Sequence, residues 1–361
     1  MTTSEERAEL ARTVRSALER ESGSELVRAA MAAPRGYDEK LWSVLCEQVG
    51  VAALAIPERY GGFGAGVREV QAVAEELGRG VTPSPLLGST LATQALLASG
   101  DDDACARMLP GLASGSQIAA LGWVDVSGRW SPERTAFTAQ PRGGEAPRYV
   151  IDGAAHYVLD GDTADVLLVV GDCAGELGLF EVDPALAHRA HTASMDGSRR
   201  FATVALDAVP ARRIGGDIRQ ALASVRDIAC AVLAAEQVGA AAEALAMTVA
   251  YSKERVQFGR PIGSFQALKH RMADMHVLVD TARSACYAAG DAIDAGSAES
   301  PDAALTAKVY CSETFETVAA EMIQLHGGIA ITWEHDAHLY FKRAHSSSQL
   351  FGMPHEHLAR R

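Results

Sequence analysis

The sequence predicts an α+β fold in three parts. These are an N-terminal helical domain over residues 1–116, a central β-barrel or β-sandwich over 117–216, and a C-terminal four-helix bundle over 217–361. Before residue 116 and after residue 217, apolar residues recur at helical spacing. Between them lie short runs rich in β-branched residues and bounded by Gly, Asp and Pro, as in strands. After residue 217 the helical stretches become long and their connections short, which is typical of a helix bundle.

The first part is expected to contain short helices broken by proline and glycine. Helical patterns cover residues 38–50, 66–80 and 89–100. Between the first two patterns, Pro57 and the pair Gly61-Gly62 end one helix and delay the next. Proline lacks the amide hydrogen that a helix interior needs, and glycine leaves the backbone free to turn.

The central part is expected to be built from strands. Short segments of strand character cover residues 149–159, 164–172, 175–183 and 199–210. Each ends at turn-forming residues, and their regular spacing favours a small barrel or sandwich.

The last part is expected to hold the long helices. The first covers residues 217–257 and stops at Phe258–Pro261, where a glycine and then a proline follow. A second covers residues 267–294. Ser300 is expected to cap a third, with Pro301 in its first turn and the pair Gly327-Gly328 at its end. A shorter helix over residues 333–351 completes the bundle.

Composition narrows the function classes. With 33 Lys and Arg against 46 Asp and Glu, the formal net charge is −13, which disfavours nucleic-acid binding. The six cysteines form no CxxC pair, so neither a zinc site nor a disulfide framework is indicated. No uninterrupted apolar stretch is long enough to cross a bilayer, and the N-terminus lacks an apolar signal core. A cytoplasmic protein without a membrane anchor is expected.

Three segments then carry a family resemblance. Arg255 opens a stretch of the form RxxFGxxxxxxQ that includes Phe258 and ends at Gln266. A second segment runs from Gln324 to Gly328, and a third, residues 57–64, reads PERYGGFG. In this order the segments resemble those of acyl-CoA dehydrogenases over nearly the whole chain. The resemblance implies the fold of that family, an FAD cofactor and an acyl-CoA substrate.

In that family, the matching residues hold the ADP half of an FAD that sits in the neighbouring subunit. Arg255 offers a planar cation suited to pyrophosphate, and Phe258 is expected to add an apolar face one helical turn away. Glycines let backbone amides approach phosphates closely. The residues that the resemblance assigns to this role are Arg255, Phe258, Gln266, Gln324, Gly327 and Gly328.

The sequence departs from the family where the flavin ring would bind. A TExxxGSD stretch is usual at the start of the β domain, but residues 120–127 read ALGWVDVS and lack the hydroxyl–acid pair. The segment that places an aromatic and a threonine against the ring corresponds to Tyr157-Val158-Leu159. Tyr157 keeps the aromatic, whereas Leu159 cannot donate a hydrogen bond.

The catalytic base is also displaced from its usual position. Most members carry a glutamate where Phe351 stands here, and phenylalanine cannot accept a proton. Some relatives place the glutamate on the first long bundle helix, at a position that falls on Ala229. Asp227 lies two residues away and Glu236 farther along, so Asp227 is the candidate base and Glu236 an alternative.

Three functions follow as alternatives. The chain is a self-sufficient, homo-oligomeric acyl-CoA dehydrogenase, a partner subunit that gives the ADP-binding half of an FAD site to a second acyl-CoA dehydrogenase-like chain, or a binding protein on this fold. The sequence keeps the residues that the family uses for the ADP group but not those that it uses at the flavin ring. This difference favours the partner subunit over the other two alternatives, and we expect it to form part of a tetramer. The resemblance to paired dehydrogenases of this kind implies a bulky acyl-CoA substrate, such as a steroid side chain. No metal site is expected, since His335, His338 and His345 have no carboxylates at ligand spacing.

Overall fold

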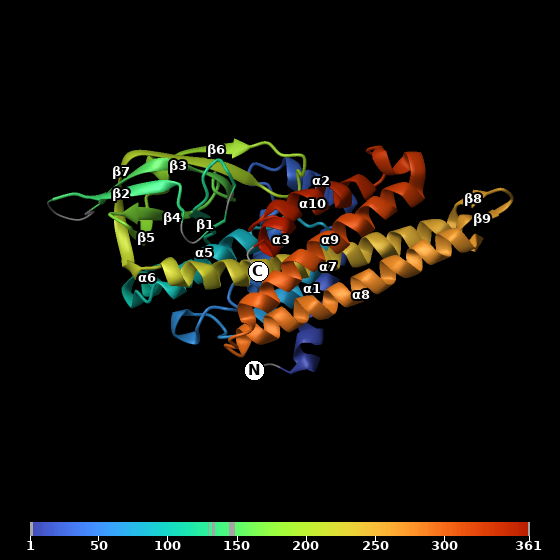
Figure 1. The fold of residues 1–361 in the computed structure, drawn as a ribbon, viewed down its shortest axis with the longest axis horizontal. Helices are drawn as coiled ribbons and strands as arrows, with labels where there is room; N and C mark the ends of the chain where they lie inside the picture. Colours follow the sequence, from blue (N-terminus) through green and yellow to red (C-terminus); the bar gives the residue numbers. More distant parts are fainter. Residues whose placement is uncertain (1–2, 129, 132–133, 144–148, 360–361) are drawn as a thin grey trace.

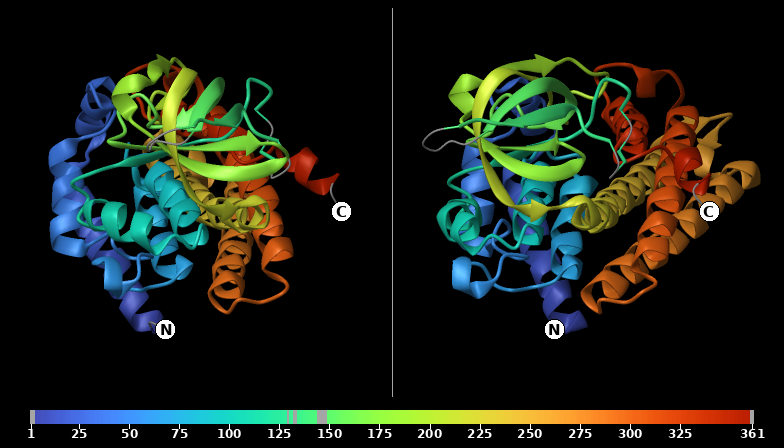
Figure 2. Two further views of the ribbon diagram at one scale, coloured as in Figure 1. Left: turned by 90° about the vertical axis from the view of Figure 1, so that its left-hand side faces the viewer. Right: turned by 60° about the vertical axis from the view of Figure 1, so that its left-hand side comes forward.

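A computed structural model describes residues 3–128, 130–131, 134–143 and 149–359, and it confirms the predicted α+β fold (Figure 1). A helical N-terminal part is followed by a β-barrel and then by long helices. The N-terminal helices and the long helices lie side by side on the same side of the barrel (Figure 2). The N-terminal helices are α1 (Ser4–Glu21), α2 (Ser24–Ala32), α3 (Glu39–Val44), α4 (Val67–Arg79), α5 (Leu86–Ala98) and α6 (Asp102–Ala113).

The β part closes on itself as a barrel. Strand β4 pairs with both β2 and β5, and the path β4-β2-β3-β7-β5 returns to β4, with β1 and β6 as outer strands. Closure removes the open edges that would invite pairing with other chains. Apolar side chains such as Phe137, Val169, Phe180 and Val204 form one buried cluster between these strands. The strands are β1 (Ala119–Gly122), β2 (Phe137–Pro141), β3 (Tyr149–Leu159), β4 (Val166–Cys173), β5 (Glu176–Val182), β6 (His188–Thr192) and β7 (Phe201–Asp217).

The C-terminal part consists of long helices, and its far end carries a small hairpin. The prediction that the first helix runs to Gln257 was wrong by three residues, because α7 ends at Glu254. Phe258 and Gly259 have φ angles of 54° and 77°, so they turn a hairpin between β8 (Val256–Gln257) and β9 (Arg260–Pro261). The helices are α7 (Arg219–Glu254), α8 (Gln266–Asp294), α9 (Ser300–His326), α10 (Ala337–Gln349) and the short α11 (Pro354–Leu358).

Two further helix boundaries differ from the predictions. Ser300 is the first residue of α9 and Glu299 its cap, so Ser300 is not the capping residue. The last long helix begins at Ala337, and His335 therefore lies in the preceding turn and not on the helix with His338 and His345. Among the described residues, no three His, Cys, Asp or Glu side chains gather as metal ligands.

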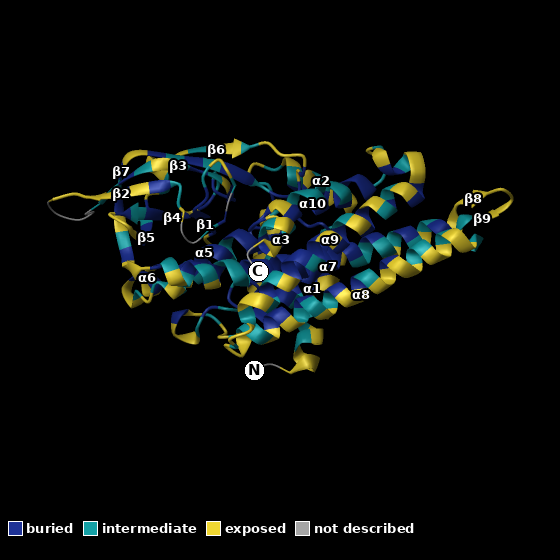
Figure 3. Ribbon diagram, in the orientation of Figure 1, coloured by how far each residue is buried: buried dark blue, intermediate teal, exposed yellow. Residues whose placement is uncertain are grey.

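Helix α7 is the core helix of the molecule. By length and composition it is apolar enough to span a membrane, although no uninterrupted apolar run marks it in the sequence. In the fold, 78% of its most apolar stretch is buried by protein (Figure 3). The surrounding helices and the barrel therefore supply the apolar surroundings that its composition requires.

A pair of glycines brings α4 against α7. A Cβ added to Gly78 of α4 would lie 2.0 Å from the carbonyl oxygen of Glu236, and one added to Gly239 of α7 would lie 1.8 Å from that of Glu75. Both distances are far below van der Waals contact, so only glycine allows this approach. The two helices are thus in backbone contact near the middle of α7.

This contact predicts the effect of Gly239→Ala. In an ordinary helix interior the change stabilises by about 1 kcal/mol, because alanine is the better helix former. Here we expect a loss of about 2–4 kcal/mol in the free energy of unfolding, since the added methyl collides with backbone and not with a movable side chain. Urea unfolding measures the difference, with Gly216→Ala as control because no atom lies within 4 Å of its added Cβ. A stabilised Gly239→Ala variant would contradict the packing described.

Candidate functional site

The far end of the bundle brings together the two segments that the sequence assigned to an ADP group. Tyr251, in the last turn of α7, stacks on His326 at 4.4 Å, and its hydroxyl donates to the His326 carbonyl at 3.3 Å. Arg271 of α8 pairs with Glu321 of α9 at 2.6 Å. The end of α7, the start of α8 and the end of α9 therefore meet at one site.

The side chains of Arg255 and Phe258 are exposed to solvent at this end of the bundle. Arg255 follows the last turn of α7 in extended conformation and is exposed. No carboxylate of the described residues forms an ion pair with it. Phe258 is 93% exposed at the hairpin turn. The expectation that the two lie one helical turn apart was wrong, because the hairpin and not α7 carries Phe258.

Phe258 is held in an unfavourable backbone conformation. A positive φ in a two-residue hairpin turn suits Asn or Gly, whereas a bulky side chain there is strained by about 1 kcal/mol or more. The fold thus keeps a large apolar ring both strained and exposed to solvent. Such a combination is typical of a residue that contacts something outside its own chain.

The remaining predicted ADP contacts are also accessible. Gln266 is the first residue of α8, whose N-terminal amides receive no side-chain cap, and it is exposed together with Gln324. An added Cβ on Gly327 or Gly328 would meet no atom within 4 Å, so the backbone of this pair faces open space. Residues 253–271 hold five Lys and Arg and only one Glu, within a chain of net charge −13. The surface therefore suits an anion.

The residues predicted to face the flavin ring lie on strand β3 of the barrel. Tyr157 sits in a bulge of β3 with φ 56°, 39% exposed, against the loop at Gly128. Leu159 is buried in the core. From Asp227 to Arg255 is 28 residues, or about 42 Å of helix. The candidate base Asp227 is therefore far along α7 from the predicted ADP contacts.

At the barrel end, aromatic side chains meet where a flavin ring and a base were expected. Trp130 packs edge-on against Trp123 at 5.6 Å and against Phe351 at 4.9 Å between ring centroids. The three are at most 2% exposed. Phe351, at the usual position of the glutamate, is thus a core residue.

The carboxylates proposed as displaced bases both have cationic neighbours. The Asp227 side chain is 14% exposed and forms an ion pair with the adjacent Arg226 at 3.2 Å. The next residue, Ile228, lines a surface groove of about 970 Å³. Glu236 is buried between two guanidinium groups, forming an ion pair with Arg199 and one with Arg343 at 3.1 Å. Ala229 is buried. Of the two, Asp227 is partly exposed, whereas Glu236 is buried and lines a crevice of only about 10 Å³.

Two buried cationic features were not found by sequence reasoning. Arg199 and Arg343 join Glu236 and Asp196 in an ion cluster between the barrel, α7 and α10. Lys308 is fully buried and donates to the carbonyls of Ser347 and Ser348, at the end of α10. Burial lowers the pKa of Lys308 to about 8. These contacts join residues far apart in the chain, so local patterns carry no signal for them.

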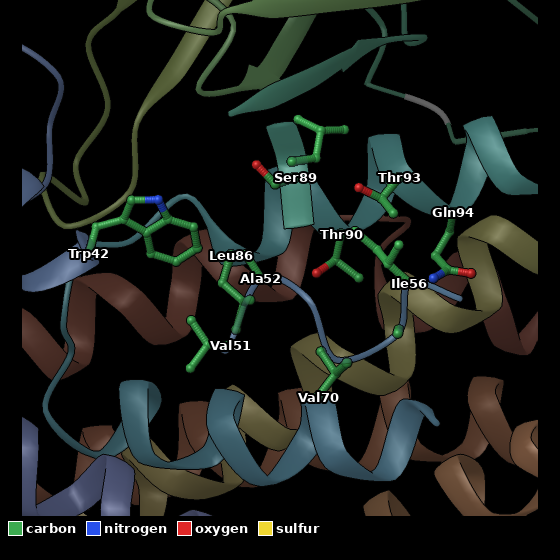
Figure 4. A pocket seen from close by; sticks show the side chains of 12 residues that line it. Trp42, Val51, Ala52, Ile56, Val70, Leu86, Ser89, Thr90, Thr93 and Gln94 are labelled. Carbon is green, nitrogen blue, oxygen red and sulfur yellow. The ribbon is translucent and has the colours of Figure 1, made fainter. Parts of the chain in front are cut away.

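A small crevice lies between α5 and the turn at residues 51–56 (Figure 4). Trp42, Val51 and Ile56 line it together with Thr90 and Thr93 of α5. Its volume of about 20 Å³ accommodates roughly one water molecule. It is too small for an acyl chain and is not a substrate pocket.

The residues of the bundle end and those of the barrel end therefore differ in how well they suit the part of FAD expected there. The bundle end offers an exposed arginine that forms no ion pair with any described residue, an exposed aromatic ring and an open glycine pair, which fit an ADP group. The barrel end offers a buried leucine and a closed aromatic cluster, which do not fit an isoalloxazine ring. The accessible residues thus match the ADP half of the expected site better than its ring half.

Comparisons with known proteins agree with the fold. The family models for the acyl-CoA dehydrogenase N-terminal and C-terminal domains match residues 4–116 and 227–354. The acyl-CoA dehydrogenases IpdE2 of Mycobacterium tuberculosis and Mycolicibacterium smegmatis are 46% and 43% identical, over 100% and 99% of this chain and 97% and 98% of theirs.

Solved structures of paired chains are also similar. A Tcur3481–Tcur3483 steroid ACAD has a chain 31% identical to this one, with a TM-score of 0.89 over 99% of this chain and 97% of that one. A chain of the ChsE4–ChsE5 complex from Mycobacterium tuberculosis is 26% identical, with a TM-score of 0.88 over 99% and 96%.

Asp160, next to Leu159, gives a pH-dependent prediction. Burial raises the pKa of this carboxyl to about 7, against the opposing charge of Arg199. The unfolded chain titrates near pH 4, so ionisation favours unfolding progressively from about pH 4 to 7 and no further above that. Asp160→Asn removes this cost. We expect the variant to gain a few kcal/mol over the wild type at pH 8 and much less at pH 5, by urea unfolding. An equal difference at both pH values would contradict this assignment.

Proposed function

This chain belongs to the acyl-CoA dehydrogenase family, and we propose that it is the subunit that supplies the ADP-binding half of an FAD site to a second acyl-CoA dehydrogenase-like chain. The proposal rests mainly on the contrast between the exposed residues at the bundle end and the buried residues at the barrel end. The residues suited to ADP are exposed at one end, whereas Leu159 and Phe351, which the resemblance assigns to the places of the ring contact and the base, are core side chains. An FAD held by the first group must have its ring in another chain.

The roles of the residues follow from their chemistry. Arg255 binds the pyrophosphate through its guanidinium, and amides of Gly327 and Gly328 donate to phosphate oxygens without a Cβ in the way. Gln266 and Gln324 orient the nucleotide through their amides. Phe258 covers an apolar part of the cofactor and excludes water there. The bound FAD supplies the hydride acceptor for α,β-dehydrogenation of the acyl-CoA, and the partner chain supplies the base.

Three further properties belong to the proposal. We assign a tetramer of two chain types, supported by the similarity to chains of paired complexes. We assign a bulky acyl-CoA substrate of the steroid type, supported by the similarity to a steroid ACAD. We assign the cytoplasm as the location, supported by the acidic composition and by the burial of α7 within the protein.

Arg255→Ala tests the pyrophosphate role in the assembled complex. Removing a charge-assisted contact is expected to cost about 1.5–3 kcal/mol, so the dissociation constant of FAD should rise tenfold or more. Visible absorbance after gel filtration of the complex reports the flavin retained. Lys253→Ala is the matched control, since this exposed cation lies on the same helix end and contributes the same long-range field. Unchanged flavin content in Arg255→Ala would refute the role.

Phe258→Asn separates binding from stability. Asparagine accepts the positive φ of the hairpin turn, so the isolated chain should gain about 0.5–1 kcal/mol of stability. The complex should nevertheless retain less FAD, because the apolar contact is lost. Thermal unfolding of the isolated chain and flavin absorbance of the complex measure the two effects. A variant that is more stable and also retains all its flavin would show that Phe258 does not contact the cofactor.

A further inference from the structure

Three ring side chains meet at the bundle end, next to the glycine pair. Tyr251 of α7 stacks on His326 of α9, with ring centroids 4.4 Å apart and planes 24° from parallel. His335, in the turn before α10, lies 4.6 Å from His326 and 6.4 Å from Tyr251 between ring centroids. Tyr251, His326 and His335 are here called the ring clamp. The clamp ties residues that precede and follow Gly327-Gly328 to the end of α7.

The clamp fixes the backbone where the chain enters the glycine pair. The Tyr251 hydroxyl donates to the His326 carbonyl at 3.3 Å. This carbonyl and the Gly327 nitrogen belong to one planar peptide unit, so the hydrogen bond fixes the direction in which the chain reaches Gly327. Gly327 then turns with φ 65° and ψ −145°, a conformation that glycine adopts more readily than other residues. The orientation of the Gly327-Gly328 backbone therefore depends on the position of the two rings.

The hydrogen bonds of His326 identify the tautomer of its neutral ring. Nδ1 lies 2.8 Å from the Met322 carbonyl, which can only accept, so Nδ1 carries the proton. Nε2 is buried and has no hydrogen-bond partner among the described residues. A second proton would create a buried cation with an unpaired donor, which is costly. Burial accordingly lowers the pKa of His326 below its ordinary value of about 6.5, although the hydrogen bond to Met322 opposes this.

Two titratable side chains face His326, and neither is a carboxylate that could balance a charge on it. Tyr251 approaches from α7 and His335 from the turn before α10. Burial also lowers the pKa of His335, against the charge of Asp336. The surroundings of His326 therefore favour an uncharged ring.

We propose that the ring clamp positions the Gly327-Gly328 backbone for the ADP group, and that it holds only while His326 is uncharged. His326 is a positioning residue that acts through the glycine pair, because its free nitrogen is buried and does not reach a ligand. Uptake of a proton opens the stack, since the ring regains its ordinary pKa only in water. FAD binding therefore weakens as the pH falls below about 6.5. The inference rests on the proposed function and adds proton-linked control of cofactor retention.

His326→Phe tests the clamp in the assembled complex, because phenylalanine keeps a ring on Tyr251 but cannot take up a proton. The dissociation constant of FAD is measured at pH 7.5 and 5.5, with sedimentation to confirm that the complex stays assembled. For the wild type we expect a rise of about five- to tenfold in acid, since one proton changes the constant at most about tenfold per pH unit. For His326→Phe we expect a change of less than about twofold. His270→Phe, at an exposed position of α8, is the control and should keep the wild-type dependence.

Tyr251→Phe isolates the hydrogen bond from the stack. The variant keeps both rings, so the pH dependence should remain while FAD binds about threefold more weakly at both pH values. Hydrogen exchange of residues 325–332 in the isolated chain gives a readout that does not involve FAD. Compared with His326→Phe at the same pH, the wild type should exchange faster at pH 5.5 and equally at pH 7.5.

The outcomes separate the two proposals. Equal pH dependence in the wild type and His326→Phe, or tighter FAD binding in acid, would overturn the clamp, and loss of flavin in Arg255→Ala would still support the proposed function. If hydrogen exchange follows the expectation while Arg255→Ala keeps its flavin, the clamp stands as a property of the chain and the ADP role is wrong.

Discussion

The length and burial of α7 are the constraint on which the rest of the structure depends. This one helix runs from the barrel to the bundle end, and α4 lies in backbone contact with it through Gly78 and Gly239. A buried helix with such a contact cannot bend or shorten without opening the core. It therefore keeps Asp227 about 42 Å from Arg255, the first of the proposed ADP contacts.

The two ends have diverged in different ways. Three features at the bundle end are exposed: Arg255, Phe258 and the glycine pair Gly327-Gly328. Arg255 forms no ion pair with a described residue. A protein that acted as a monomer would gain no stability from this arrangement. At the barrel end, Trp123, Trp130, Phe351 and Leu159 are buried in the core. Buried aromatic pairs stabilise by about 0.5–1.5 kcal/mol each beyond their area. The barrel end is thus stabilised by its packing, whereas the bundle end keeps a strained residue, Phe258, where the proposal gives it a ligand.

Periodicity in the sequence was enough to predict the three-part fold, and the three segments at residues 57–64, 255–266 and 324–328 together were enough to recognise the family. The sequence did not reveal that Phe258 and Gly259 turn a hairpin, because a phenylalanine with positive φ contradicts local preference. It also did not reveal the ion cluster of Arg199, Glu236 and Arg343, which joins three distant segments. Phe351 was recognised as a missing base, but only the structure brings it against Trp130. Local patterns predict elements, whereas long-range packing decides which site residues meet.

The most direct test of the account is the ratio of flavin to chain, from visible absorbance and protein concentration. It should be measured for this chain alone and for the complex with its acyl-CoA dehydrogenase-like partner. The account predicts almost no flavin on the isolated chain and one FAD for every two chains in the complex. One FAD per chain in a homo-oligomer would contradict it, since the barrel end would then bind a ring despite the packing of Trp123, Trp130 and Phe351.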